Sequence, residues 1–250
     1  MYRPRKSIHS ENAIMNAMIR IIRVSCCAAI AFFILAVFGG ATSVRAQQSA
    51  PTTVITWRVT GSYVPSSYIG KVLPNSESAI TASVMVFDNG KIANVSGDTV
   101  YWYLNNTPLG GGPGATSFTF TPFAGSGSAA TLKVEIPDYP GGLIIKTTPI
   151  YITAPIAVIR TLYPAATFSA NPLIASADPY FFPATSANQL SYEWSVNSQA
   201  ISGAENPDVL HVSLGPGTTA GSRFDITLSV AAGNSTIATD EKILTYQPLP

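Results

Sequence analysis

Residues that could carry catalysis are few in this chain of 250 residues, and they are scattered along it. Both cysteines, Cys26 and Cys27, lie near the N-terminus, and His211 is the one histidine beyond residue 46. A catalytic triad or a zinc site needs several ligands or partners that converge, and no second His or Cys is available to join His211. We therefore interpret His211 as an ordinary strand residue and expect no catalytic residue, no metal site and no cofactor.

Paired carboxylates are the other chemistry to consider, because two of them can hydrolyse a glycosidic bond. The candidates are Glu193, Glu205, Asp208 and Asp225. Glu193 and Asp225 alternate with apolar residues, so on strands they face solvent. Glu205 and Asp208 flank an Asn-Pro turn. Ordinary solvated positions explain all four, and we predict that the protein is not an enzyme.

Three loop segments have a ligand-binding composition, but each lacks part of the required motif. The segments 88–90 (Asp-Asn-Gly) and 97–98 (Gly-Asp) offer oxygen ligands to calcium, yet Asp-Asn-Gly is first of all a hairpin turn. The segment 110–116 is rich in glycine, but no Gly-Lys-Ser/Thr follows it, as a phosphate loop would require. We predict a hairpin at the first segment and a flexible connection between strands at the glycine run.

Composition narrows the class of protein further. The chain has 14 basic and 13 acidic residues, and this near balance gives no reason to expect a nucleic-acid partner. Only 11% of the residues are charged, while 19 are glycine and 19 are proline, which argues against long solvated helices. Six of the basic residues lie within residues 1–46, so positive charge is concentrated at the N-terminus.

The first 46 residues have the order of an export signal. Arg20 and Arg23 precede an apolar stretch, two glycines end it, and Val44-Arg45-Ala46 predicts cleavage between Ala46 and Gln47. The alternative is a retained anchor, because residues 24–44 are long enough to span a bilayer. In either case the rest of the chain is expected outside the cytoplasm, secreted or associated with the cell envelope, with membrane contact only through residues 24–44.

From Pro51 onward, short alternating runs rich in Val, Ile, Thr, Tyr and Phe are separated by Gly, Pro, Asn and Ser, which is typical of an antiparallel sandwich. The pattern repeats at an offset of 92 residues. Three segments keep this spacing, and they are 100–105 with 192–197, 118–120 with 210–212, and 132–136 with 224–228. We predict one sandwich over 51–153 and a second over 154–247.

Alternation also assigns the aromatic residues to faces. Trp102 and Trp194 lie on the apolar side of their strands and are predicted to anchor the two cores. Tyr101 and Tyr103 point the opposite way. Tyr180-Phe181 occupies a loop next to proline. Exposed aromatics of this kind grip proteins or sugars, or else they pack the junction between the sandwiches, and the sequence leaves both interpretations open.

The segments 192–197 and 221–234 resemble bacterial PKD and Ig-like modules, with a Tyr-x-Trp strand and then a Gly-x-aromatic strand that ends in a small turn. The first repeat is a looser match, because Leu132 replaces the aromatic residue and prolines follow the strand. The whole chain resembles exported proteins of candidate-phylum bacteria with small genomes. The resemblance implies an all-β fold of two tandem Ig-like or PKD-like sandwiches after an N-terminal signal or anchor helix, and it implies no reaction.

We therefore expect a non-enzymatic structural or interaction protein outside the cytoplasm. Its two modules would act as a spacer or as a docking or adhesion unit at the cell envelope, with another envelope or surface protein as partner. The alternative is a carbohydrate-binding module that recognises cell-wall or extracellular glycan through Tyr101, Tyr103, Tyr180 and Phe181. The oligomeric state is left open.

Overall fold

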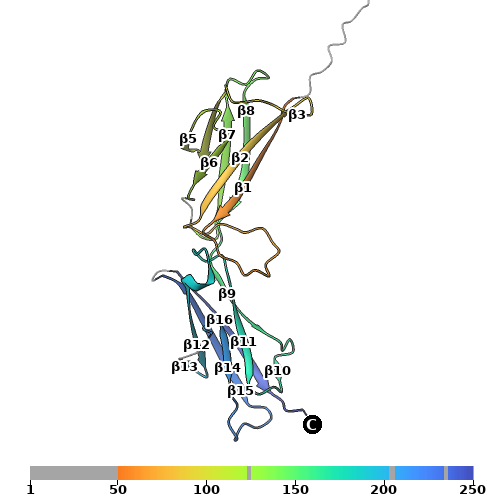
Figure 1. Cartoon of the computed structure of the whole chain (residues 1–250), viewed down its shortest axis with the longest axis vertical. Coiled ribbons are helices and arrows are strands. Elements are labelled where there is room, and N and C mark those ends of the chain that lie inside the picture. Colours follow the sequence, from red (N-terminus) through yellow and green to blue (C-terminus); the bar gives the residue numbers. More distant parts are fainter. Residues whose placement is uncertain (1–49, 123–124, 203–205, 234–235, 250) are drawn as a thin grey trace, which may run out of the picture. The chain divides into compact units, whose positions relative to one another are not determined.

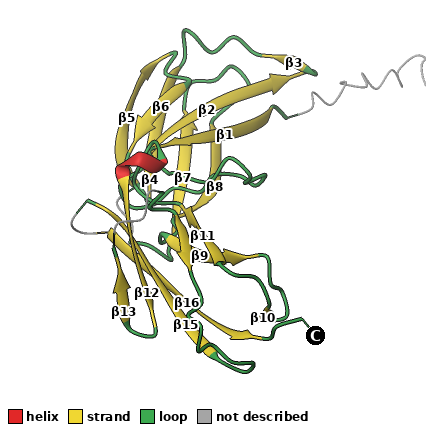
Figure 2. Ribbon diagram, turned by 60° about the horizontal axis from the view of Figure 1, so that its bottom comes forward, coloured by secondary structure: helices red, strands yellow, loops and turns green. Residues whose placement is uncertain are grey.

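The computed structural model describes residues 50–122, 125–202, 206–233 and 236–249. The predicted cleavage site at Ala46 and Gln47 and the apolar segment 24–44 lie outside the described residues. Within the described ranges, no helix is both long and apolar enough to cross a membrane. Strands dominate, and one short 3-10 helix, η1 (Ala187–Gln189), precedes β12 (Figures 1 and 2).

The strands of the first sandwich are β1 (Thr52–Thr60), β2 (Ala79–Asp88), β3 (Lys91–Ile92), β4 (Thr99–Leu104), β5 (Thr107–Pro113), β6 (Ser117–Phe120), β7 (Ala129–Ile136) and β8 (Ile144–Tyr151). One sheet has the order β1-β2-β3, with β6 also paired to β2, and the other has the order β5-β4-β7-β8. All of these pairs are antiparallel. Residues alternate between the core and solvent along each long strand, and Trp102 is fully buried between the sheets.

The strands of the second sandwich are β9 (Ile156–Thr161), β10 (Thr167–Phe168), β11 (Leu173–Tyr180), β12 (Leu190–Val196), β13 (Gln199–Ile201), β14 (Val209–Val212), β15 (Arg223–Ala232) and β16 (Thr236–Tyr246). Its sheets have the orders β14-β11-β9 and β10-β16-β15-β12-β13. The pairing is antiparallel except for the two-residue contact of β10 with β16. Trp194 is 4% exposed within this core. The predicted fold class, two antiparallel Ig-like sandwiches in tandem, is confirmed.

The two sandwiches repeat the same polar contact at their centres. The indole nitrogen of Trp102 donates to the carbonyl oxygen of Ala115 at 2.8 Å, and that of Trp194 donates to Pro207 at 2.9 Å. In each case the acceptor lies 13 residues after the tryptophan. A buried indole N–H needs such an acceptor, so this contact belongs to the repeated unit.

The constant offset of 92 residues was wrong for the third pair of strands. Trp102 lies opposite Val134, whereas Trp194 lies opposite Leu228. Val134 therefore corresponds to Leu228, two positions beyond the Ile226 that the constant offset predicts. The additional residues lie in the connection between β14 and β15, because loops accept insertions that a paired strand does not.

The prediction for the turn at residues 88–90 is confirmed, whereas the prediction for the glycine run is not. Asn89 and Gly90 have φ of 48° and 75°, as a two-residue hairpin turn between β2 and β3 requires, which confirms the predicted hairpin. The prediction of a flexible connection at the glycine run was wrong, because Gly110–Gly112 lie in β5 and pair with β4. A Cβ atom on Gly111 would lie 2.2 Å from the carbonyl oxygen of Val100, so glycine permits this close approach of the strands.

Candidate functional site

Tyr101 is an exposed aromatic residue on the outer face of the β5-β4-β7-β8 sheet. Its side chain is 42% exposed, and the strand register places it between Gly111 on β5 and Glu135 on β7. A Cβ atom on Gly111 would lie 3.1 Å from Cδ1 of Tyr101, so the ring lies against the glycine backbone. The exposed ring therefore has the Gly111 backbone on one side and the Glu135 carboxylate on the other.

Tyr103, two positions along β4, is covered rather than open. The ammonium nitrogen of Lys133 lies 4.1 Å from the centroid of its ring. The Glu135 carboxylate, by hydrogen bonding to the phenol, raises the pKa of Tyr103, and desolvation adds to this effect. Lys133 and Glu135 also form an ion pair at 3.5 Å. Of the two tyrosines predicted to form a ligand surface, only Tyr101 presents an open ring.

Phe181 is buried and does not belong to an open surface of this kind. Its side chain is only 7% exposed, and its backbone has a left-handed φ of 61°. Its N–H donates to the carbonyl of Tyr63 at 2.6 Å, and the N–H of Tyr63 donates to Phe182 at 2.8 Å. Phe181 is buried because residues 61–78, which connect β1 to β2 and lie more than 100 positions earlier in the chain, dock on this turn.

Tyr180 takes part in the same contact. The ring of Tyr68, from the segment between β1 and β2, meets the rings of Tyr180 and Phe181 edge to face, with centroids 5.9 and 5.7 Å apart. Burial, followed by the charge of Asp178, raises the pKa of Tyr180. For Tyr180 and Phe181, these contacts favour the second of the two interpretations, in which aromatics pack a junction between the sandwiches.

Asn75 is the polar centre of this junction and is only 1% exposed. Its side-chain nitrogen donates to the carbonyls of Phe181 at 3.0 Å and Gly61 at 3.3 Å. Its side-chain oxygen accepts the N–H of Glu77 at 2.9 Å, and its own N–H donates to the hydroxyl of Ser78 at 3.0 Å. We refer to residues 61–78 and 180–182 together as the joint. Every polar group of the Asn75 side chain is used within it.

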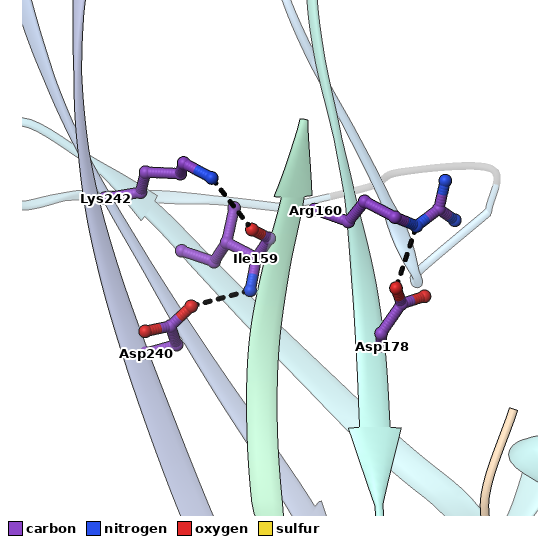
Figure 3. Close-up of polar contacts among 5 residues, drawn as sticks. All are labelled: Ile159, Arg160, Asp178, Asp240 and Lys242. Atoms are coloured by element: carbon purple, nitrogen blue, oxygen red, sulfur yellow. Dashed lines mark hydrogen bonds and ion pairs between the residues drawn. The ribbon is translucent and has the colours of Figure 1, made fainter. Parts of the chain in front are cut away.

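A charged pair lies beside the joint in the second sandwich. Arg160 on β9 donates through Nε to Asp178 on β11 at 2.8 Å, and the Asp178 residue is 8% exposed (Figure 3). This hydrogen bond is the largest cause of the raised pKa of Arg160. Sequence patterns missed Asp178 and Asn75, because each is buried by residues distant in the chain and neither interrupts the local alternation.

The remaining candidate residues are dispersed. His211, Glu193, Asp208 and Asp225 are exposed on separate strands or turns, and Glu205 lies outside the described residues. Asp88, which offers an oxygen ligand but was predicted to lie in a hairpin turn, accepts hydrogen bonds from the Asn89 amide at 3.1 Å and the Tyr139 hydroxyl at 3.3 Å. Throughout the part of the chain that the structure describes, no group of three His, Cys, Asp or Glu side chains could hold a metal ion.

Comparison with known proteins gives similarity of fold. No family model matches the chain, and no curated protein matches it in sequence. Among solved structures, three N-terminal domains of the outer capsid protein Hoc of bacteriophage RB49 are 14% identical, with a TM-score of 0.42 over 79% of this chain. This chain spans 59% of the length of that fragment.

Two further structures share this similarity. The fibronectin(III)-like modules of Clostridium thermocellum CbhA are 17% identical, with 76% of this chain and 93% of that chain covered and a TM-score of 0.27. The C-terminal fragment of intimin, in complex with the intimin-binding domain of its translocated receptor, is 12% identical, with 78% and 64% covered and a TM-score of 0.28. The strand order defines a protein of tandem Ig-like β-sandwich modules, and these neighbours are modules of bacterial surface and phage proteins.

Proposed function

We propose that the chain is a non-enzymatic structural protein that acts outside the cytoplasm, with its two Ig-like modules serving as a spacer or docking unit at the cell envelope. The joint is the observation that supports this role most. A spacer must hold its modules in a fixed relation. Such a role is served by a junction in which Asn75 is 1% exposed and Tyr63 is joined to Phe181 and to Phe182 by one backbone hydrogen bond each.

Location is tested on the native protein from separated soluble and membrane fractions, by intact mass and N-terminal residue. A soluble species that begins at Gln47 indicates a released module, and a membrane-bound species that keeps residues 24–44 indicates a tethered one. Protease added to intact cells should degrade either species. A full-length protein that is found in the cytoplasm and protected from protease contradicts the proposal.

The spacer role is tested by the distance between two spin labels, one on each sandwich. Thr119→Cys on β6 and Glu193→Cys on β12 provide exposed attachment sites in a chain in which Cys26 and Cys27 are replaced by alanine. A fixed joint predicts one narrow distance distribution, which Asn75→Ala broadens. A broad distribution for the chain with intact Asn75 would exclude a rigid spacer.

A carbohydrate-binding role is the second candidate, and the open ring of Tyr101 is the observation that favours it. Sugar C–H groups stack on an exposed aromatic face, and Glu135 beside it offers a hydrogen-bond acceptor for hydroxyl groups. Binding of the protein to purified cell-wall polysaccharide is the test. Tyr101→Ala should abolish binding, whereas Tyr151→Ala, which changes a more exposed tyrosine on β8, should not. The absence of binding by the unmodified protein removes this candidate.

A further inference from the structure

Within the part of the chain that the structure describes, the strand β1 is an edge of its sheet. The N–H of Val84 on β2 donates to Thr116, next to β6, so the even-numbered residues of β2 bond away from β1. The even-numbered residues of β1 consequently bond to β2. The odd-numbered ones, 53, 55, 57 and 59, direct N–H and C=O outward. Across the ranges that the structure describes, none of these eight groups has a hydrogen-bond partner.

The corresponding edge of the second sandwich is closed by two charged side chains. The N–H of Ile159 on β9 donates to the Asp240 carboxylate at 2.6 Å, and the ammonium of Lys242 donates to the Ile159 carbonyl at 3.3 Å (Figure 3). Asp240 and Lys242 lie on β16, which belongs to the opposite sheet. Ile159 is only 2% exposed. Inward-pointing charges are one way in which proteins prevent edge strands from pairing with other chains.

Strand register identifies the matching positions in the first sandwich. In the second sandwich, Leu228 on β15 pairs with Trp194 on β12 and, on its other side, with Asp240 on β16. In the first sandwich, Val134 on β7 pairs with Trp102 on β4 and, on its other side, with Lys146 on β8. Lysine therefore occupies the place of the aspartate that accepts the edge N–H. An ammonium group has three donors and no acceptor, so it cannot perform that task.

The edge residue that corresponds to Ile159 is Ile55. Ile55 lies opposite Val84, and Ile159 lies opposite Ala177. The N–H of Val84 donates to Thr116, which directly follows Ala115, the acceptor of the Trp102 indole. The N–H of Ala177 donates to Asp208, which directly follows Pro207, the acceptor of the Trp194 indole. Ile55 is partly exposed, whereas Ile159 is buried. Where β1 and β8 begin, the first sandwich has an open groove of about 430 Å³, lined by residues 50–53 and 141–146, which include Thr53 and Lys146.

The other edge strand at this groove, β8, is protected. The N–H of Ile152 donates to Ser128, so even-numbered residues of β8 bond to β7 and odd-numbered ones point outward. Pro149 is among the outward residues and has no N–H to offer. Proline in an outward position is a common block on an edge strand. The unprotected edge at this groove is therefore β1, which contains neither proline nor a bulge over its nine residues.

We propose that β1 pairs with β1 of a second copy of this chain, in antiparallel orientation about a two-fold axis at Thr56. This register uses all four outward residues of each strand, because residue 53 pairs with 59 and residue 55 pairs with 57 of the second copy. The inference goes beyond the proposed function and does not depend on it.

Side-chain matching favours a second copy over an unrelated strand. In this register Ile55 lies opposite Trp57, a β-branched–aromatic pair, and Thr56 lies opposite its own counterpart. Arg58 lies opposite Val54, so like charges do not meet. Moving the axis to Arg58 would place the two arginines opposite each other and would use fewer outward residues.

Disulfide cross-linking tests the register in the full chain, with Cys26 and Cys27 replaced by alanine. In the proposed dimer the two Thr56 residues form a non-hydrogen-bonded pair with Cα atoms about 4.5 Å apart, which suits a disulfide. Thr56→Cys should therefore give a covalent dimer under mild oxidation. Thr60→Cys, on the same face, should not, because Thr60 lies opposite Thr52. A mixture of Thr52→Cys and Thr60→Cys chains should give the mixed dimer.

Two variants test whether the cross-link depends on the edge. Ile55→Pro removes one outward N–H and should abolish the cross-link, whereas Thr147→Pro, which changes an outward position of β8, should leave it. Thr56→Lys on the exposed face brings two ammonium groups together and should raise the dimer Kd about fivefold in sedimentation experiments. Thr119→Lys on β6 is its control.

Near-UV circular dichroism of the tryptophans checks the fold of every variant. Three results would overturn the proposal: a folded Thr56→Cys chain that does not cross-link, equal cross-linking of Thr60→Cys, or a cross-link that survives Ile55→Pro. Any of them would mean that the β1 edge pairs with a different strand or with none.

Discussion

Replacing Asn75 by alanine is the most informative change to the joint. The side chain makes three hydrogen bonds, to the carbonyls of Phe181 and Gly61 and from the N–H of Glu77, in a site where the residue is 1% exposed. Each such bond contributes about 1 kcal/mol net, and alanine supplies no replacement for any of them. We expect Asn75→Ala to lower the free energy of unfolding by about 3 kcal/mol.

Urea unfolding followed by tryptophan fluorescence measures this loss. Asn94→Ala is the matched control, because Asn94 makes one exposed hydrogen bond, to the N–H of Ser96 at 3.1 Å. That variant should lose less than about 0.5 kcal/mol. Native-state hydrogen exchange at the Phe181 amide, which bonds to Tyr63, should speed up in Asn75→Ala alone. If the two alanine variants have equal stability, Asn75 does not hold the joint together and the reasoning fails.

Three further predictions concern the two sandwiches. Gly111→Ala should destabilise the protein by about 1–3 kcal/mol in the same urea assay, because its Cβ would meet the Val100 carbonyl at 2.2 Å, whereas Gly112→Ala, with open space around it, should cost less. Asp240→Ala leaves the buried Ile159 N–H without an acceptor and should cost about 1–3 kcal/mol. Burial chiefly raises the pKa of Tyr192 from 10.0 to about 12, so the folded state holds this proton more tightly and stability should fall as pH rises between these values, less steeply in Tyr192→Phe.

Local patterns in the sequence were sufficient for the fold and for the two core anchors. A period of two places Val100, Trp102 and Leu104 on one face, and all three are at most 1% exposed. The glycine run misled the prediction, because glycine carries no side chain and therefore no alternation. Its strand is set by the close approach to β4 and not by any pattern of its own.

The joint could not be predicted, because its contacts connect residues far apart in the chain. The hydrogen bond from Asn75 to Phe181 spans 106 positions, and no periodicity records a contact of that separation. Phe181 next to proline looks like an exposed loop residue until residues 61–78 are placed over it. The hydrogen bond from the Ile159 N–H to the Asp240 carboxylate likewise depends on how the two sheets of the second sandwich pack. Alternation within a strand does not determine that packing.

The β1 edge of the first sandwich should be closable by a single substitution at Lys146. If an inward aspartate is what closes the second sandwich, then Lys146→Asp should close the first, because its carboxylate can accept the outward N–H of Ile55. This variant should lose the Thr56→Cys cross-link and should remain at least as stable in urea. Lys146→Ala removes the ammonium without adding an acceptor and should keep the cross-link. If both variants still dimerise, a carboxylate at this position is not what closes an edge, and the contrast between Lys146 and Asp240 does not explain why one sandwich would pair and the other would not.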